Sequence, residues 1–238
     1  NHKYDMTVLL AYDTTGPVPA DHEIIQVGGV FCTDDLHKVH ARFGSYIKTQ
    51  KPENAVQIFI RRLVIEGKDV LKQNQKYWSS PSSVWTHFSD LIDQYGSDES
   101  GLSDVRITVF DASRARGFLQ QSLQHSDEYK EGLVNYAGGL IQTTADYSAF
   151  LAHHGRDLNL HTQFRETQNK YELWRRVLDF HNVEISNLND AVDRASCMRK
   201  CYLNFFNKWE KNESTNKRSG RRRSKRRGSK SAPVTRRD

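Results

Sequence analysis

The feature that most constrains this chain is a pair of apolar, strand-like segments joined by a turn-rich stretch near its start. Residues 8–32 read VLLAYDTTGPVPADHEIIQVGGVFC. An apolar run ends in an acidic residue followed by Thr-Thr-Gly, and a second apolar run, from Ile24 to Phe31, follows. Apolar runs bounded by Gly and Pro are typical of strands that are separated by a turn. The sequence therefore predicts a sheet whose first strand ends at an acid, Asp13.

The junction between these strands resembles the first motif of the DEDD exonuclease superfamily, in which the strand ends in D-x-E-T-T-G. The same frame here reads A-Y-D-T-T-G, from Ala11 to Gly16. The resemblance implies a site where carboxylates hold two divalent cations against the scissile phosphate. Ala11 has no oxygen to offer a metal, and Asp13 is one methylene shorter than the family's glutamate. The alternative interpretation is a plain strand-to-turn sequence.

A second segment resembles the second motif of the same superfamily, roughly V-x-H-N-A-S-F-D-R-G-F-L. Residues 109–119 read VFDASRARGFL, about a hundred positions after the first motif. In this alignment Ala115 takes the place of a metal-binding aspartate, and Arg114 adds a positive charge nearby. By itself, the segment predicts a strand over 106–110 that enters a helix capped by Asp111 or Ser113.

The family's third motif, H-x-A-L-x-D-A, has a counterpart in residues 187–195, NLNDAVDRA. Two registers are open. If Asp193 stands on the family's aspartate, Leu188 stands where the histidine base would be; if Asp190 does, Ile185 stands there. Neither register supplies the histidine. The segment that follows predicts a helix, because its apolar residues recur near one face: Ala195, Met198, Tyr202, Phe205, Phe206 and Trp209.

The resemblance therefore implies an exonuclease site that has lost most of its metal ligands. The two carboxylates that remain could hold one cation weakly, but they would not build a paired-metal clamp. We expect no catalytic residue, no resident metal and no cofactor. The alternative is a residual metal-dependent 3′–5′ exonuclease that uses Asp13, Asp111 and Asp193. The degenerate site positions are Ala11, Asp13, Ala115, Leu188 and Asp193.

The charge of the chain is divided between its body and its end. Residues 217–238 hold eleven of the 35 Lys and Arg residues and one of the 29 Asp and Glu residues, so this tail carries +10 and the rest −4. The tail lacks apolar residues at core spacing, so we expect 211–238 to be disordered. It suits phosphate backbones, with a nuclear localisation signal and a solubilising role as alternatives. The expected RNA-binding residues are Arg114, Arg116, Lys217, Arg218, Arg221, Arg222, Arg223, Lys225, Arg226, Arg227 and Lys230.

Cysteine usage and hydropathy favour a protein of a reducing compartment. No apolar run approaches the length of a membrane span, and we expect no signal peptide before the first strand. Cys197 and Cys201 are four apart and could ligate zinc together with a histidine. No second pair exists, so a core or surface role is favoured. The third cysteine is Cys32, and an odd count fits a reducing compartment. We expect a cytoplasmic location, with a nuclear one through the basic tail as the alternative.

The order of the remaining elements predicts an α/β fold. A third strand over 43–48 and a helix over 83–95 precede the second motif, and a helix over 172–180 follows it. Strands first and helices later indicate a mixed sheet flanked by helices, of the ribonuclease-H-like exonuclease type. We expect one exonuclease-like domain over 1–210, followed by the basic tail.

Among families with such a decayed site, the chain most resembles the Exuperantia family of maternal-RNA localisation factors. The shared points are the aspartate before Thr-Thr-Gly, the second strand from Asp21 to Gln26, the F-x-x-Y-I third strand and the Arg-rich end. That family keeps an aspartate where Ala11 stands, and it carries a further helical domain for which this chain has little room. The resemblance implies an inactive RNA-binding scaffold for mRNA localisation in ribonucleoprotein particles, with RNA and particle proteins as partners and no membrane. It also implies a homodimer.

Overall fold

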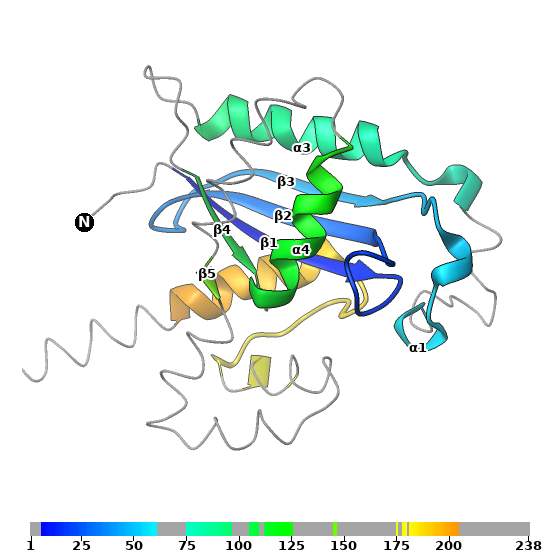
Figure 1. Ribbon diagram of the computed structural model, residues 1–238. Helices are drawn as coiled ribbons and strands as arrows, with labels where there is room; N and C mark the ends of the chain where they lie inside the picture. Colours follow the sequence, from blue (N-terminus) through cyan, green and yellow to red (C-terminus); the bar gives the residue numbers. More distant parts are fainter. Residues whose placement is uncertain are drawn as a thin grey trace, which may run out of the picture.

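The computed structural model of the chain describes residues 6–60, 75–96, 105–109, 112–125, 145–146, 175, 178–179 and 181–204. These residues contain a five-stranded sheet with the strand order β3-β2-β1-β4-β5 (Figure 1). β1 pairs antiparallel with β2, and β2 with β3, whereas β4 runs parallel to β1 and β5 parallel to β4. The predicted mixed sheet is confirmed. The strands are β1 (Met6–Thr14), β2 (Ile24–Thr33), β3 (Val39–Tyr46), β4 (Val105–Val109) and β5 (Ala145–Asp146).

Helices cover both faces of this sheet. In Figure 1, α3 and α4 lie on one side, and the orange helix that contains residues 191–204 lies on the other. We call residues 191–204 the C-terminal helix segment. The labelled helices are α1 (Gln57–Ile60), α3 (Pro81–Gly96) and α4 (Ala112–Leu123), and two short 3-10 turns are η1 (Pro52–Asn54) and η3 (Gln75–Tyr77).

The central strand β1 is buried on both faces. Val8 and Leu10 belong to an apolar cluster with side chains of α3 and α4. Leu9 and Ala11 belong to a second cluster with the C-terminal helix segment. Successive side chains of a strand point to opposite faces, so a strand covered on both sides reads as a continuous apolar run. All three cysteines are buried in the second cluster, so Cys32 lies in a buried strand as predicted, and Cys197 and Cys201 have a core position rather than a surface one.

Several boundaries differ from those that the sequence predicts. β3 begins at Val39 and ends at Tyr46, four residues before the predicted start and two before the predicted end. α4 begins at Ala112, so Ser113 lies inside the helix instead of capping it, and Asp111 lies outside the described residues. α3 confirms the helix expected over 83–95. Residues 205–238, with the whole tail, lie outside the described residues, as does most of the helix expected over 172–180.

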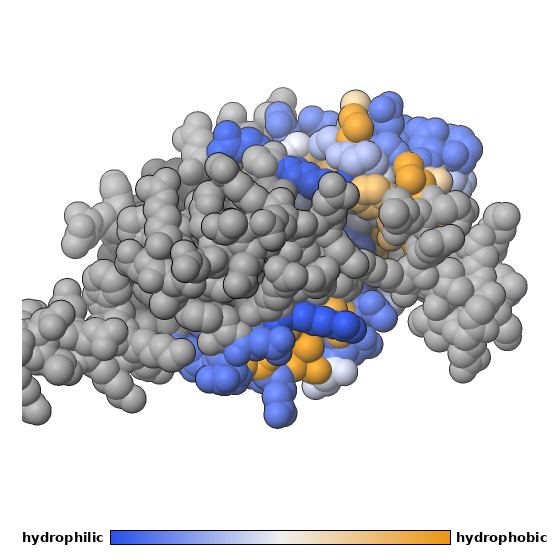
Figure 2. Space-filling model, turned by 90° about the horizontal axis from the view of Figure 1, so that it is seen from below, coloured by the Kyte–Doolittle hydropathy of each residue, from blue (hydrophilic) through white to orange (hydrophobic). Residues whose placement is uncertain are grey.

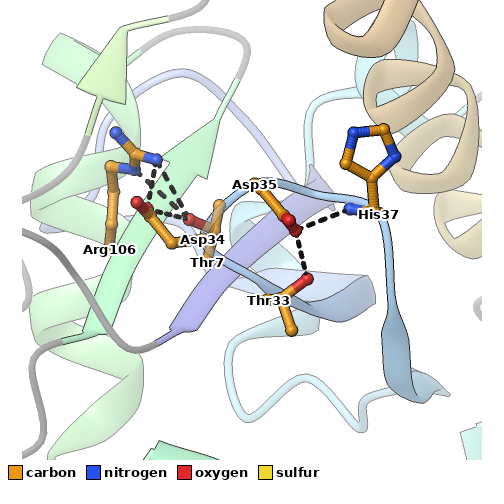
Figure 3. A network of polar contacts seen from close by, with 6 residues as sticks. All are labelled: Thr7, Thr33, Asp34, Asp35, His37 and Arg106. Atoms are coloured by element: carbon orange, nitrogen blue, oxygen red, sulfur yellow. Dashed lines mark hydrogen bonds and ion pairs between the residues drawn. The ribbon is translucent and has the colours of Figure 1, made fainter.

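A polar network ties the sheet together near the start of β1 (Figure 3). Arg106 on β4 donates through Nη2 to Asp34 at 2.6 Å and to Thr7 at 3.2 Å. Asp35 accepts hydrogen bonds from the hydroxyl of Thr33 at 2.6 Å and from the backbone of His37 at 3.0 Å. These contacts fix the turn between β2 and β3, at the end of β1 opposite to Asp13.

The described residues that are visible in Figure 2 form no large apolar face. In Figure 2 the coloured part is mostly hydrophilic, and its hydrophobic residues form small separate groups. Within the described part of the chain, no helix is both long enough and apolar enough to cross a membrane.

Candidate nuclease-like site

Three small residues form a row across the sheet, beneath the start of the C-terminal helix segment. Ala11 on β1 pairs with Gly28 on β2, and Gly28 pairs with Gly44 on β3. A Cβ atom on Gly28 would lie 2.3 Å from the backbone carbonyl carbon of Ala191, and one on Gly44 would lie 2.3 Å from Cγ2 of Val192. Ala11 is buried in the apolar cluster that includes Ala191. The methyl group of Ala11 is therefore part of a close helix-on-sheet contact.

A polar row lies two residues further along the same strands, and hence on the same face of the sheet. Asp13 pairs with Gln26, and Gln26 pairs with Tyr46. In the orientation that satisfies its neighbours, the Gln26 side-chain nitrogen donates to Asp13 Oδ2 at 2.7 Å and to the carbonyl oxygen of Asn189 at 2.9 Å. Its oxygen accepts from the Tyr46 hydroxyl at 3.2 Å. The three side chains form one hydrogen-bonded series across the sheet.

The cation beside this row is Arg194, from the C-terminal helix segment. Its Nη2 lies 2.6 Å from Asp13 Oδ2, and its Nη1 donates to the carbonyl oxygen of Leu188 at 2.8 Å. The side chain of Arg194 is 1% exposed and that of Asp13 is 10% exposed. A buried charge is tolerated only when a partner neutralises it. Asp13 and Arg194 supply that neutralisation to each other.

The two aspartates of the third motif, Asp190 and Asp193, make different contacts in the structure. Burial is the largest cause of the raised pKa of Tyr46, and the carboxylates of Asp190 and then Asp13 raise it further. Asp190 and Asp13 therefore both act on the Tyr46 hydroxyl. Asp190 Oδ1 accepts from the backbone nitrogen of Asp193 at 2.9 Å and caps the helix segment. Asp193 Oδ2 accepts from the backbone nitrogen of Asn187 at 3.0 Å. Both aspartates therefore make backbone contacts at the start of the C-terminal helix segment.

The residues of the second motif lie in different surroundings. Ala115 is fully buried in the apolar cluster on the α3 and α4 side of the sheet, whereas Ala11 belongs to the cluster on the other side. The guanidinium of Arg114 lies 5.2 Å from the centre of the Phe59 ring, which links α4 to α1. Arg116 is exposed. The other predicted RNA-binding residues, from Lys217 onward, lie outside the described residues.

These side chains do not fit a pair of divalent cations. Such cations require several oxygen ligands, of which carboxylates are the strongest. Among the described residues, no three His, Cys, Asp or Glu side chains gather as a metal site would need. The positions of Ala11 and Ala115 contribute methyl groups, and Asp13 already accepts two hydrogen bonds, one of them from a cation. The guanidinium of Arg194 lies directly beside this carboxylate.

Sequence reasoning missed Arg194, Gln26 and Tyr46 as members of this site. One signal for Arg194 was available, because it follows Ala191 by three positions and precedes Met198 by four, on the apolar face of the helix. A charged residue in the middle of an apolar face requires a buried partner. No local signal marks Gln26 or Tyr46, since their roles depend on how the strands pair.

The chain matches no protein-family model and no curated protein sequence. Solved structures resemble it. Cell-death related nuclease 4 superposes with a TM-score of 0.60 at 11% identity, over 86% of this chain and 64% of that one. A 3′-exonuclease described by its 3′-end-specific recognition of a histone mRNA stem-loop gives 0.56 at 12% identity, over 87% and 84%. The nuclease domain of 3′hExo, a DEDDh family member bound to rAMP, gives 0.53 at 11% identity, over 87% and 94%.

The class that this sheet and these helices define is the ribonuclease-H-like exonuclease fold, as the sequence predicts. At 11–12% identity the likeness shows the fold alone. The chain spans 64% of the length of cell-death related nuclease 4.

Proposed function

We propose that this protein is a catalytically inactive, exonuclease-like protein that binds RNA. The observation that carries the proposal is the packing of Ala11 and Ala115, the two positions where the DEDD resemblance expects metal-binding carboxylates. Each is a methyl group closed into an apolar cluster and has no oxygen to offer a metal. A paired-metal mechanism needs oxygens at both positions to stabilise the attacking and leaving oxygens.

The nucleic-acid part of the proposal has support from the fold and from the surface. Of the proteins with this fold, one 3′-exonuclease recognises a histone mRNA stem-loop, and the nuclease domain of 3′hExo is bound to rAMP. On this chain Tyr77 is 74% exposed, and Lys76 Nζ lies 4.7 Å above its ring. Aromatic faces stack on bases and cations attract phosphates, a combination typical of surfaces that bind single strands. Arg116 adds an exposed cation on α4.

The resemblance to the Exuperantia family extends this proposal to a biological role. In that role the protein is a homodimeric scaffold in a cytoplasmic ribonucleoprotein particle and contributes to mRNA localisation. Its basic end adds affinity for phosphate backbones, or directs the protein to the nucleus. A degenerate nuclease domain that keeps RNA affinity without cleavage suits this role, because an RNA in transport must remain intact.

The test is a degradation assay with purified full-length protein on labelled single-stranded and double-stranded RNA and DNA, with Mg²⁺ and Mn²⁺. We expect intact substrates under every condition, together with a shift in fluorescence anisotropy for the RNA. Trimming that needs metal and disappears in Asp13→Ala would replace this proposal with the residual exonuclease. An absence of any anisotropy shift would contradict RNA binding.

A matched pair of variants tests the surface part of the proposal. Arg116→Ala removes an exposed cation of α4, and Lys38→Ala removes an exposed cation of the turn between β2 and β3, at the other end of β1. We expect weaker RNA binding for Arg116→Ala and unchanged binding for Lys38→Ala. Equal effects of the two substitutions would mean that α4 makes no particular contact with RNA.

A further inference from the structure

Arg194 stands where its helix should carry an apolar residue. Ala191, Ala195 and Met198 surround it on the face of the C-terminal helix segment that packs on the sheet, and none of them is more than 1% exposed. Arg194 itself is fully buried. Placing an arginine there costs several kcal/mol of desolvation unless the opposite surface offers charges and acceptors that fit it. The opposite surface is therefore shaped for a cation.

That surface is the polar row of the sheet together with the segment before the helix. Asp13 accepts the guanidinium at 2.6 Å, and the carbonyl oxygen of Leu188 accepts its other terminal nitrogen at 2.8 Å. Gln26 donates both to the same Asp13 oxygen and to Asn189, so it connects the ion pair to the chain that leads into the helix. The Asp190 carboxylate acts on Tyr46 alongside Asp13.

We propose that Arg194 is a built-in cation that occupies the divalent-metal position of this site, so that the folded protein excludes metal ions and holds its third motif in place without them. The inference deepens the proposed function and rests on it. It names the side chain that keeps metal ions away from Asp13, since the loss of the other carboxylates alone would still allow Asp13 to bind a single ion. The side chain that excludes the ion also fastens the C-terminal helix segment to β1.

Distances explain why the two cations compete. A divalent ion lies about 2.0–2.6 Å from a carboxylate oxygen. The guanidinium nitrogen lies 2.6 Å from Asp13 Oδ2. A metal ion on that oxygen would meet a like charge at contact distance, where repulsion in a poorly solvated site is large. Either the arginine or the metal can neutralise Asp13. The arginine has the advantage, because it is part of the chain and is always present, whereas a metal ion must bind from solution.

The inference predicts that removal of the guanidinium opens a metal site. Arg194→Met keeps an unbranched side chain on the helix face and removes the charge. Asp13 and the carbonyl oxygen of Leu188, the two acceptors that the guanidinium leaves, then remain as candidate oxygen ligands, with water completing the shell. Sites with so few charged ligands bind weakly, so we expect a dissociation constant for Mn²⁺ of about 0.1–1 mM.

The experiment compares wild type, Asp13→Asn, Arg194→Met and the double variant Asp13→Asn with Arg194→Met. Mn²⁺ binding is measured by electron paramagnetic resonance, and thermal unfolding is followed with EDTA or with saturating Mn²⁺. Only Arg194→Met should bind Mn²⁺, and its Tm should rise by about 2–8 °C on binding. The wild type should show no Tm difference between EDTA and Mn²⁺. The double variant should show none either, because it lacks the Asp13 carboxylate.

Each other outcome is decisive. Mn²⁺ binding by the wild type that Asp13→Asn abolishes would overturn the exclusion of metal, and if no cleavage accompanied it, the proposed inactive function would still stand. Cleavage by the wild type would overturn both. If Arg194→Met is unfolded in EDTA, recovery of its far-UV circular dichroism with Mn²⁺ is the expected result. A variant that neither binds Mn²⁺ nor recovers would overturn the inference.

Discussion

The carboxylate of Asp13 and the guanidinium of Arg194, 181 positions apart in the chain, form a buried ion pair at 2.6 Å. The pair joins the end of the central strand β1 to the helix that covers one face of the sheet. It also lies where the DEDD resemblance expects metal chemistry. A contact that neutralises the site therefore also holds the fold together, and substitutions there are expected to change stability before they change anything else.

The first prediction concerns the contribution of this ion pair to the free energy of unfolding. Asp13→Asn and Arg194→Met, each alone, should lower the free energy of unfolding by about 3–5 kcal/mol, because each leaves one charge buried without its partner. The double variant should lose much less than the sum of the two. Urea unfolding in EDTA measures all three values and gives the coupling between the residues.

A second ion pair of the same length supplies the control. Asp34 and Arg106 also lie 2.6 Å apart, but their side chains are 28% and 32% exposed. Partly hydrated pairs contribute about 0–1 kcal/mol, so Asp34→Asn should cost no more than about that amount. If Asp13→Asn and Asp34→Asn lower the free energy of unfolding equally, the buried ion pair stabilises the protein no more than the partly exposed one.

The second prediction concerns the close contact of the helix with β2. Gly28→Ala should destabilise the protein by about 1–3 kcal/mol or more, because the new Cβ would lie 2.3 Å from the backbone of Ala191. Gly29→Ala, one position along and on the opposite face, places its Cβ no nearer than 3.4 Å to a side chain. It should be neutral or slightly stabilising, since glycine weakens a strand. Chemical unfolding distinguishes the two, and similar effects would contradict the proposed seat for the helix.

The third prediction concerns alkaline pH. The pKa of Tyr46 is raised above its ordinary value of 10.0 by burial, and then by Asp190 and Asp13. Its folded-state pKa therefore exceeds the unfolded one, so its contribution to stability is complete below about pH 10 and is lost as the pH rises through the folded-state pKa. Tyr46→Phe should lose stability less steeply than wild type above about pH 10. Urea unfolding across that range measures the slopes.

Tyr77→Phe serves as the control for this pH dependence, because Tyr77 is 74% exposed. Its slope should follow that of the wild type. If Tyr46→Phe also follows the wild type, the hydroxyl of Tyr46 does not sense the two carboxylates.

The fourth prediction concerns the basic tail. Deletion of residues 217–238 removes eleven cations and one acid and leaves a body with a net charge of −4. RNA affinity should fall, and the plot of log K against log salt should become flatter, because fewer counterions are released on binding. Arg116→Ala should change that slope by only about 1. Unchanged affinity and slope after truncation would favour a role of the tail in nuclear localisation.

Local patterns determined most of the sheet. The apolar runs around Leu10 and Val30 predict strands, and the periodicity over 83–95 predicts α3. Burial on one or two faces of an element produces a regular spacing of apolar residues along the sequence. The strand-helix order, with the two spaced motifs, was enough to indicate the ribonuclease-H-like exonuclease fold. The start of β3 at Val39 was not predicted, since edge strands carry little apolar signal.

Only the tertiary structure determined which side chains surround Asp13. The sequence by itself showed that Ala11 lacks an oxygen and that Asp13 remains. It did not show that Gln26 and Tyr46 stand beside Asp13, because that depends on the register of two strand pairs. It also left two registers for the third motif. The partner of Asp13 is Arg194, and only the docking of the helix on the row of small residues brings these two side chains together. A contact across 181 positions has no local pattern, since it arises from packing rather than from spacing along the chain.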